Sequence, residues 1–596
     1  LIKQDVLLFS SEREDLLEKW DELAGEKKKK KNMKQDMKII RRRCRTAKML
    51  DRLLLFLLLA GIAVFILYPL ISLIGRSVFK NGRFTLEYYR LLFTRASLKF
   101  LKNSLWVASV SSVLTMTGAF FIALHLYTSS PKRRKRMENC LLLTMISPPF
   151  VSALAFIMLF GRRGLITYGL LHISANPYGW QGIVILQVIG NLSFTALFLL
   201  TFFDGIDGRL IMASRDLGAD PFHTLRFVIL PAVRPGMLSV LFTLFTMNLA
   251  DFGTPVVIGG KYKVLATEAY LQAISSADLG KASAISVLLL LPAVAAFWLY
   301  GRALPSAGTF SGAGKMQTEW NGDYRLPPVL AYLAARCSAA FFAVMALKYG
   351  NTFLNTVSNT STGHIQFTLK YFRDLPRSQM SSFCHSLVCA LAAGLLSSFV
   401  GILLAYYTRR RKIKGMAAAE FATSLPYIIP GTFFGLGYVA AFSHPPFLLR
   451  GTLWIILLNC AFRQISVGCK AANGAFATMD EKTEMAARDM GATALEILFG
   501  IVFPQLKQVF KICFVTVFTS AMTATGAIVF LISPGKNVAS VELFQSVENG
   551  RYGVASVQAV MILLVTAAVN IGSMYLFSGK EKKRNVSGTD RCTKDV

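Results

Sequence analysis

The sequence of 596 residues is poor in charge, and acidic side chains are especially scarce. Charged residues make up 16% of the chain, and 33 Asp and Glu face 65 Lys and Arg, which gives a net charge of +32. Hydrophobic residues reach 54%, which is more apolar surface than one soluble core can bury. This balance excludes an ordinary soluble domain and predicts an integral membrane protein.

Residues suited to catalysis, metal binding or nucleotide binding are also scarce. The nine cysteines form no CxxC pair and the six histidines are dispersed, which indicates neither a zinc site nor a disulfide scaffold. None of the Gly-Lys pairs fits GxxxxGK followed by Ser or Thr, the spacing of a phosphate-binding P-loop. No cluster of catalytic residues lies at one depth of the hydrophobic runs, so a membrane-embedded enzyme is disfavoured. We expect no catalytic residue, no metal site and no cofactor in this chain.

Long hydrophobic runs are abundant. A transmembrane helix needs about 20 mostly apolar residues. Runs near that length lie at 53–75, 104–127, 140–160, 182–203, 236–260, 284–304, 329–347, 386–407, 416–442, 451–468, 508–532 and 555–577. They are continuously apolar rather than alternating, which argues against a transmembrane β-barrel. The sequence therefore predicts twelve membrane-spanning helices.

Three segments of the first half return in the second half. FTLEYYR at 84–90 becomes FTLKYFR at 367–373, and NSLWVA at 103–108 becomes HSLVCA at 385–390. MASRDLGADPFHTLRFVILP at 212–231 becomes MAARDMGATALEILFGIVFP at 485–504. The expected fold is an all-α integral membrane protein of two homologous six-helix halves, each with one long cytoplasmic loop. Its expected parts are a basic tail at 1–52, a first half at 53–304, a Gly, Ser and Pro-rich linker at 305–328, a second half at 329–577 and a basic tail at 578–596.

Basic clusters at the ends of hydrophobic runs predict the orientation. These clusters are typical of cytoplasmic anchors rather than of a nucleic-acid surface, and they are KRRKR at 132–136, RRRKIK at 409–414 and KEKKR at 580–584. Both termini and both copies of the twenty-residue segment would then be cytoplasmic. The loop 76–102 would be external although it has seven basic residues and one Glu, and we expect its FTLEYYRLLF segment to be an interfacial helix. No methionine precedes Met33, so one interpretation is that translation begins there and that 1–32 is upstream sequence.

The twenty-residue segment predicts a short helix that ends in a sharp turn. Asp207 and Asp480 hold equivalent places as N-caps. Gly218 and Gly491 are the expected left-handed residues at which the helix ends.

A second helix is expected to start directly after the turn. Its predicted N-cap is Asp220, followed by Pro221, in the first copy. In the second copy Thr493 and Glu496 form a predicted capping box. We expect this helix to run to Pro231 or Pro504 before the chain re-enters the membrane.

At this point the sequence resembles the inner-membrane permeases of binding-protein-dependent ABC importers. Their signature is Glu-Ala-Ala, three residues, Gly, nine residues, Ile, any residue, Leu-Pro. The first copy reads Met212-Ala213-Ser214, Gly218, then Val228-Ile229-Leu230-Pro231, and the second reads Met485-Ala486-Ala487, Gly491, then Ile501-Val502-Phe503-Pro504, with both spacings kept. The departure is Met in place of Glu in both copies, although Glu484 lies one place earlier in the second.

The resemblance implies partners and roles. In that family the short helix docks on a cytoplasmic ATPase, so we expect two ATPase copies that bind ATP and Mg, an extracytoplasmic binding protein, and a location in the bacterial plasma (inner) membrane. The residues implied in ATPase coupling are Met212, Ala213, Arg215, Asp216, Gly218, Pro231, Met485, Ala486, Arg488, Asp489, Gly491 and Pro504.

Several stretches narrow the resemblance to the fused permeases of the ferric iron type. They are SPPFVSALAFIMLFGRRGLIT at 147–167, ADFGTPVVIGG at 250–260, VLATEAY at 264–270 and AIVFLISPG at 527–535. Permeases for thiamine and 2-aminoethylphosphonate share the architecture, so these substrates stay as alternatives.

The membrane runs offer few groups for a solute. A stable Fe(III) site would need several carboxylate, phenolate or imidazole ligands facing one cavity, which the runs do not provide. Asp251 is the carboxylate deep in a candidate pore helix, and with Thr254 and Pro255 it is the expected substrate path. The alternative is that Asp251 pairs with a basic neighbour. Pro148, Pro149, Pro426 and Pro430 could break helices around the path, although proline is common in membrane helices.

A competing class is an ion-coupled secondary transporter of two six-helix halves. It would predict paired carboxylates or a charged relay at mid-depth and would leave the two duplicated cytoplasmic segments unexplained.

Overall fold

The computed structural model describes residues 45–303 and 324–578, apart from 81, 146, 163, 174–175, 277, 360–364 and 446–447. Most of the expected linker and most of the two expected tails lie outside the described residues. The chain divides into two compact units, Gly61–Thr478 with Val509–Val596 and Leu1–Ala60 with Met479–Gln508.

Helices dominate the described chain, and they confirm the all-α membrane class. The elements of the first half are η1 (Ala63–Leu67), α2 (Tyr68–Val78), β1 (Phe79–Lys80), β2 (Arg83–Phe84), α3 (Glu87–Leu92), α4 (Arg95–Tyr127), α5 (Pro131–Met145), α6 (Pro149–Phe160), η2 (Leu165–Leu170), α7 (Trp180–Asp204), α8 (Gly208–Asp216), α9 (Pro221–Thr224), η3 (Leu225–Ile229), α10 (Leu230–Ala250), α11 (Gly253–Ile258), α12 (Leu265–Ile274) and α13 (Leu279–Ala303). Those of the second half are α14 (Pro328–Val357), β3 (Ser358–Asn359), β4 (Gln366–Phe367), α15 (Lys370–Arg373), α16 (Gln379–Ala405), η5 (Tyr406–Arg410), α17 (Met416–Ile428), α18 (Gly431–Phe442), α19 (Leu453–Thr478), α20 (Lys482–Asp489), α21 (Ala494–Ile497), η6 (Leu498–Val502), α22 (Phe503–Gln505), α23 (Lys507–Thr523), η7 (Ile528–Phe530), α24 (Ala539–Glu548) and α25 (Tyr552–Ser578).

Ten helices in the described residues are long and apolar enough to cross a membrane, and two bent pairs raise the number to twelve. The ten are Arg45–Val78, Arg95–Tyr127, Phe150–Leu170, Trp180–Asp204, Pro221–Ala250, Leu279–Ala296, Pro328–Val357, Gln379–Arg410, Leu453–Phe476 and Tyr552–Ser573. The pairs are Met416–Pro426 with Gly431–Phe442 and Ala494–Gln505 with Lys507–Thr523. In chain order these segments correspond to the twelve expected runs.

Four expected runs are broken rather than continuous. The run 236–260 contains the end of α10 and then α11, and the run 508–532 contains most of α23 and then η7. The other two break at a proline. The run 140–160 consists of the end of α5 and all of α6, with Pro148 as the N-cap of α6. In the run 416–442, α17 and α18 meet at Pro430, and their apolar segments are bent by 109°. Proline has no N–H to donate and restricts the residue before it, which explains why a helix ends at each site. Pro426 lies inside α17 and does not end it.

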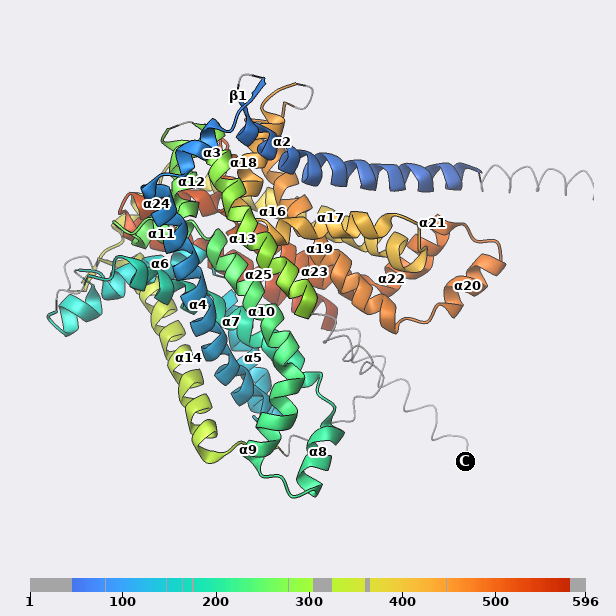
Figure 1. Cartoon of the computed structure of the whole chain (residues 1–596), viewed down its shortest axis with the longest axis horizontal. Helices are drawn as coiled ribbons and strands as arrows, with labels where there is room; N and C mark the ends of the chain where they lie inside the picture. Colours follow the sequence, from blue (N-terminus) through green and yellow to red (C-terminus); the bar gives the residue numbers. More distant parts are fainter. Residues whose placement is uncertain are drawn as a thin grey trace, which may run out of the picture. The chain divides into compact units, whose positions relative to one another are not determined.

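Small residues let the long helices approach closely. One face of α4 buries Ser104, Ala108, Ser111 and Thr115, and α4 packs along α7 and α10 (Figure 1). In the second half α16 packs along α19, and a Cβ added at Gly401 would lie 2.7 Å from the Ile465 carbonyl oxygen. Close backbone approach at small side chains is the usual way in which membrane helices associate.

A β-hairpin and a short helix repeat between the first two long helices of each half. Strand β1 pairs with β2 before α3, and β3 pairs with β4 before α15. The helix α3 includes part of the predicted interfacial segment. A Cβ added at Gly280 would lie 2.3 Å from the Tyr88 ring, and one at Gly553 would lie 2.3 Å from the Tyr371 ring. In both halves, therefore, a tyrosine packs directly on a glycine near the start of the last long helix.

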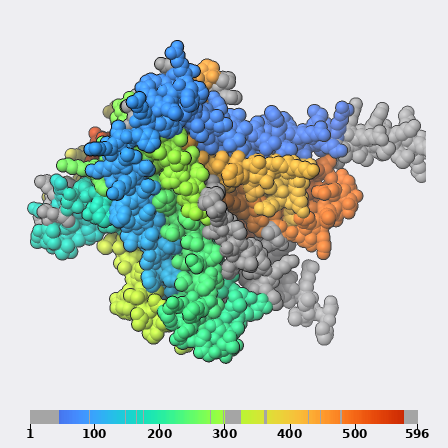
Figure 2. All heavy atoms as spheres, in the orientation of Figure 1, coloured from blue at the N-terminus to red at the C-terminus, as the bar shows by residue number. Residues whose placement is uncertain are grey.

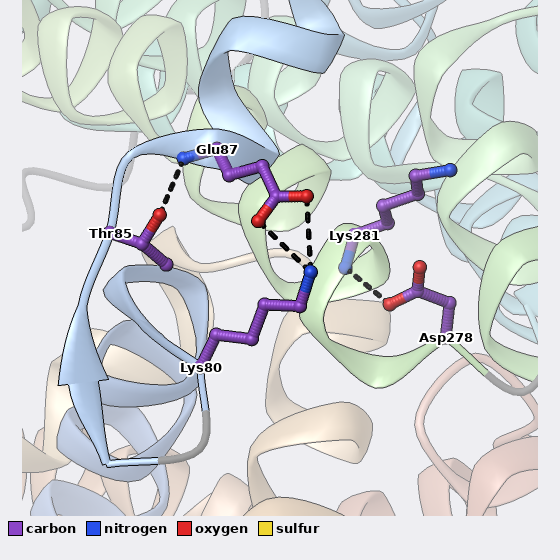
Figure 3. Close-up of polar contacts among 5 residues, drawn as sticks. All are labelled: Lys80, Thr85, Glu87, Asp278 and Lys281. Atoms are coloured by element: carbon purple, nitrogen blue, oxygen red, sulfur yellow. Dashed lines mark hydrogen bonds and ion pairs between the residues drawn. The ribbon is translucent and has the colours of Figure 1, made fainter.

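Polar contacts surround the hairpin of the first half. Lys80 Nζ donates to both carboxylate oxygens of Glu87 at 3.0 and 2.9 Å, and this hydrogen bond raises the pKa of Lys80 (Figure 3). The Thr85 hydroxyl accepts from Glu87 N at 3.1 Å, and Asp278 accepts from Lys281 N at 3.0 Å at the neighbouring start of α13. The positive charge of loop 76–102 is thus partly neutralised within the loop.

Candidate functional site

The first loop, residues 207–231, begins with the predicted capped helix. Asp207 Oδ1 accepts from Arg209 N at 3.0 Å, and Arg209 Nη2 lies 2.8 Å from Asp207 Oδ2. These contacts hold the pKa of Asp207 below its ordinary value. At the other end Gly218 has φ +81°, and its N–H and that of Ala219 donate to Arg215 and Ser214 at 2.8 and 3.1 Å. The N-cap and the left-handed glycine are both confirmed.

The second loop, residues 480–504, has nearly the same local geometry. Gly491 has φ +86°, and Gly491 N and Ala492 N donate to Arg488 and Ala487 at 3.0 Å each. The N-cap prediction is wrong by one residue, because Glu481 directly precedes α20. Asp480 nevertheless accepts from Lys482 N at 3.0 Å, the bond that Asp207 makes in the first loop. The turn of each loop is closed by the same pair of backbone bonds.

The second helix of each loop is capped as expected. Asp220 Oδ1 accepts from His223 N at 2.6 Å, and the His223 backbone and side-chain bonds lower the pKa of Asp220. In the second loop Glu496 N donates to Thr493 Oγ1 at 3.4 Å, and Thr493 N donates to Glu496 Oε2 at 2.8 Å. The capping box is confirmed, and different side chains solve the same problem in the two copies.

The expectation that the second helix ends at the proline is wrong for Pro231 and is confirmed for Pro504. The π-helical turns η3 and η6 lie directly before Leu230-Pro231 and Phe503-Pro504. In the first loop α9, η3 and α10 form one helical stretch, Pro221–Ala250. A proline ring clashes with the carbonyl four residues back in a regular α-helix, and the wider π turn gives the ring room. In the second loop the helix ends at Gln505, one residue after Pro504, and α23 begins at Lys507.

Both loops expose apolar and charged side chains together. Met212 and Met485 are 46% and 57% exposed, and Leu217 and Met490 are 88% and 83% exposed. The predicted coupling residues Ala213, Arg215, Asp216, Ala486, Arg488 and Asp489 are exposed as well. In Figure 2 the first loop, in green, projects beyond its neighbouring helices. Such a surface suits a protein partner that covers the apolar side chains and pairs with the charges.

Inside the membrane region, amides hold the Asp251 carboxylate. Gln187 Nε2 donates to Asp251 Oδ2 at 3.2 Å and to the Asn248 carbonyl at 3.1 Å, and Thr254 N donates to Asp251 Oδ1 at 3.1 Å. Asn191 Nδ2 donates to Asn248 Oδ1 at 2.8 Å. Within the described residues the ion pairs include no cation at Asp251, so the alternative of a basic neighbour is not observed.

Asp251 lies between two cavities. The Lys348 cavity, of about 360 Å³, is lined by Lys348, Gln187, Asn191, Asp251 and Thr254, among others. The Arg463 cavity, of about 350 Å³, is lined by Arg463, Gln464, Thr246 and Asp251, among others. Phe194, Met247 and Asp251 line both. Pro255 is buried in α11 and is not among the residues lining either cavity, so its predicted place on the path has no geometric support.

An aromatic cluster adjoins the Arg463 cavity. The rings of Phe150 and Phe544 are 4.7 Å apart, those of Phe252 and Tyr270 are 5.1 Å apart, and Phe530 lies 5.9 Å from Tyr270. Phe150 and Phe252 line the Arg463 cavity, whereas Tyr270 and Phe530 line a third cavity of about 800 Å³. Rings that line one cavity therefore contact rings that line the other, and they come from both halves.

Sequence reasoning missed most of this polar lining. Lys348 lies one residue beyond the expected run 329–347, although α14 continues to Val357. Gln187 and Asn191 are four residues apart in an apolar run, and that spacing on one helix face was the available signal. In the described residues no group of three or more His, Cys, Asp or Glu side chains could hold a metal ion.

The comparison with protein families decides the class. The family described as binding-protein-dependent transport system inner membrane component matches residues 115–307 and 397–582. The chain belongs to this family. Its two matches confirm a multi-pass membrane permease built from two copies of one domain.

Two relatives of this permease match across both halves. A ferric transport system permease protein of Actinobacillus pleuropneumoniae is 27% identical over 524 residues, which is 85% of this chain and 75% of the relative. A putative ferric transport system permease protein of Haemophilus influenzae is 27% identical over 80% of this chain and 77% of its own length. The thiamine transport system permease protein of Escherichia coli is 28% identical over 32% of this chain and 36% of its own length.

Proposed function

We propose that this permease is the membrane subunit of an ABC importer that moves ferric iron from an extracytoplasmic binding protein to the cytoplasm. The supporting observation for iron is the 27% identity to a ferric transport permease over 85% of the chain, against 32% of the chain for the thiamine relative. Thiamine, 2-aminoethylphosphonate or another small solute is the alternative. The proposed location is the bacterial plasma membrane with both termini in the cytoplasm.

The two loops are the proposed binding sites for two copies of a cytoplasmic ATPase that binds ATP and Mg. A helix held by a side-chain cap at one end and a glycine turn at the other moves as one body, so nucleotide-driven closure is passed to the membrane helices. The proposed contacts are the exposed Met212, Ala213, Arg215 and Asp216 in α8 and Met485, Ala486, Arg488 and Asp489 in α20. Gly218 and Gly491 shape the turns. In this proposal ATP and Mg bind to the partner ATPase and not to the permease.

The aromatic cluster is the proposed barrier on the solute path. Its rings lie between the lining of the third cavity and that of the Arg463 cavity, and in the proposal they block the passage of a solute from one to the other. Because the cluster combines Phe252 and Tyr270 of the first half with Phe530 and Phe544 of the second, relative motion of the halves would open it. Aromatic rings exclude water from such a contact without fixing its geometry by hydrogen bonds.

Reconstitution tests the proposed function. The permease is placed in proteoliposomes with its ATPase, and uptake and ATP hydrolysis are measured with a ferric binding protein or a thiamine binding protein outside. We expect ATP-dependent uptake of iron and stimulation by the ferric protein. Stimulation by the thiamine protein alone would reject iron. Uptake without the ATPase, driven by an ion gradient, would support the competing secondary transporter.

A further inference from the structure

Lys348 is a buried lysine in α14, one of the helices that are long and apolar enough to cross a membrane. Its side chain is 93% buried, and α14 continues for nine residues beyond it. The described carboxylates provide no ion pair at Lys348, and the nearest recorded partner of its Nζ is the Tyr349 ring, 4.9 Å from the centroid. A buried charge without a counter-ion is costly, and a charge inside the membrane is functional by default.

The ammonium lies at the wall of a polar cavity. The Tyr349 hydroxyl donates to the Thr144 carbonyl at 3.0 Å, and Thr144 lines the Lys348 cavity with Lys348 itself. The other lining groups include the amides of Gln187 and Asn191 and the hydroxyl of Ser152. Gln187 Oε1 is buried without a hydrogen-bond partner. The cavity thus holds a cation and an unused acceptor in the same small space.

A second cation lines the adjoining cavity. Arg463 projects from α19, and a Cβ added at Gly431 would lie 2.9 Å from Arg463 Nη2. The guanidinium therefore packs on the first residue of α18, where any larger side chain would displace it. Across the two cavities Lys348 and Arg463 face one carboxylate, Asp251. Positive charge prevails in the lining.

We propose that the two adjoining cavities form an anion-binding site in which Lys348 and Arg463 bind carboxylate or phosphonate oxygens of the transported species. The proposal rests on the transport function above and narrows its substrate class. A bare trivalent cation and thiamine, which carries a permanent positive charge, are repelled by this lining. A ferric ion enclosed by anionic ligands, or a phosphonate, is accepted. Asp251 then faces the cationic part of the solute.

Reaction of a cysteine in the cavity reports its electrostatic potential without knowledge of the substrate. Ser152, on α6, is buried and lines the Lys348 cavity, and Ser152→Cys changes one atom. The full chain carrying this change is placed in nanodiscs of neutral phosphatidylcholine. It is treated with the anionic sulfonatoethyl or the cationic trimethylammonioethyl methanethiosulfonate. Peptide mass spectrometry measures modification at residue 152 apart from the native cysteines, and each rate is divided by the rate of that reagent with a free thiol in solution.

We expect the normalised rate of the anionic reagent to be about tenfold higher, since a charged cleft concentrates counter-ions by at least that factor. Lys348→Met and, separately, Arg463→Gln should each lower that ratio severalfold, and Lys348→Arg should retain it. The matched control is Arg336→Gln, because Arg336 is exposed on the same helix α14 and lines neither cavity. Arg463→Gln keeps the test decisive if Lys348→Met does not fold.

Equal normalised rates, a preference for the cationic reagent, or no reaction with either reagent would overturn the anion site. Citrate, ferric citrate and methylphosphonate should slow the modification, and thiamine should not. Slower modification in discs that contain anionic phosphatidylglycerol, without protection by these solutes, would assign the site to lipid phosphate and reject the solute. If iron uptake fails in proteoliposomes while the reagent preference stands, the iron assignment is wrong and the anion site remains.

Discussion

The two halves of the permease share the positions of helix starts, π turns and connecting hydrogen bonds, but they differ in the side chains that line the cavities. Helices α7 and α19 begin at Trp180 and Leu453, 273 positions apart, and α13 and α25 begin at the same separation. Ser104 Oγ accepts from Leu265 N at 2.7 Å, and Ser386 Oγ accepts from Ala539 N at 2.8 Å. The π turns η3 and η6 also coincide in this register. The elements that bend, cap and connect the helices are therefore duplicated.

The membrane interior does not keep this duplication. With the same separation of 273 positions, Cys460 of the second half corresponds to Gln187, and Ala524 corresponds to Asp251. The second half therefore has no equivalent of these two polar lining residues. Lys348 and Arg463 come from the second half without charged counterparts in the first. The comparison teaches that the loops proposed to bind the ATPase are duplicated, whereas the lining of the cavities proposed for the solute is not.

The largest expected effect comes from removing the glycine turn of either loop. Proline is fixed near φ −65° and has no N–H, so Gly218→Pro and Gly491→Pro lose both the φ of about +80° and the bonds to Arg215 and Arg488. We expect each change to abolish ATP-driven transport. Insertion into the membrane should persist, and so should binding of an ATPase subunit to the unchanged loop. Uptake in proteoliposomes measures this.

The matched control is asparagine at the same positions. Nothing lies within 4 Å of a Cβ added at Gly218 or Gly491, and asparagine tolerates a left-handed conformation. Gly218→Asn and Gly491→Asn should retain most transport. Normal transport by the proline variants would show that the loops do not act as levers.

Asp251→Asn tests the asymmetric interior. The Asn oxygen keeps the bond from Thr254 N, and its NH2 group can donate to Gln187 Oε1 once the Gln187 amide turns over, so the protein should fold without the charge. Uptake should fall about tenfold, a loss of roughly 1.4 kcal/mol in transition-state stabilisation. Glu268→Gln is the control, because Glu268 lies outside both cavities and its bond to Gln272 survives the change. Equal uptake by the two variants would remove Asp251 from the solute path.

Variants at the two tyrosine-on-glycine contacts test whether the duplicated packing contributes equally to stability in both halves. Gly280→Ala and Gly553→Ala place a methyl group 2.3 Å from the rings of Tyr88 and Tyr371, and overpacking of this kind costs about 1–3 kcal/mol. We expect both to lower the thermal unfolding temperature by similar amounts. Gly350→Ala, which meets no atom within 4 Å, should not. A loss in one half alone would show that the duplicated contacts are not equivalent in stability.

Local signals in the sequence predicted the loops, and long-range contacts explain what it did not predict. The helix ends at 207–220 and 493–496 depend on residues within three or four positions of one another, so capping rules sufficed. The bond from Gln187 to Asp251 joins residues 64 positions apart, and no periodicity shows it. Lys348 was missed because the hydrophobic run stops at 347, while α14 continues to Val357 and Lys348 lines a cavity formed with residues distant in the sequence. The π turns before Pro231 and Pro504 depend on how the helix accommodates the ring, which the proline alone does not reveal.

Restoring the family signature tests the difference that the two loops share. Met212→Glu and Met485→Glu reintroduce the carboxylate that the resemblance leads us to expect, at side chains that are about half exposed. If the partner ATPase of this permease presents an apolar contact, each variant should reduce coupled ATP hydrolysis severalfold, and the double variant should reduce it further. Met→Leu at the same positions is the control and should be neutral. Increased coupling in the glutamate variants would show that the ATPase retains a site for the carboxylate.

The smallest expected effect distinguishes the caps of the second helices. Asp220 is held below its ordinary pKa by its bonds to His223, so its stabilising contribution is present at neutral pH and is lost only as the pH falls through the lowered pKa. Thr493 does not titrate. The Glu496 carboxylate accepts a second bond, which the uncharged backbone N–H of Thr493 donates. Asp220→Ala should therefore speed amide hydrogen exchange in 221–225 about fivefold at pH 7. Thr493→Ala should speed exchange less in 494–498, because the Glu496 carboxylate still accepts from the backbone N–H of residue 493. Hydrogen exchange with mass spectrometry measures both, and equal acceleration in the two loops would mean that the capping box gives no more protection than the single aspartate.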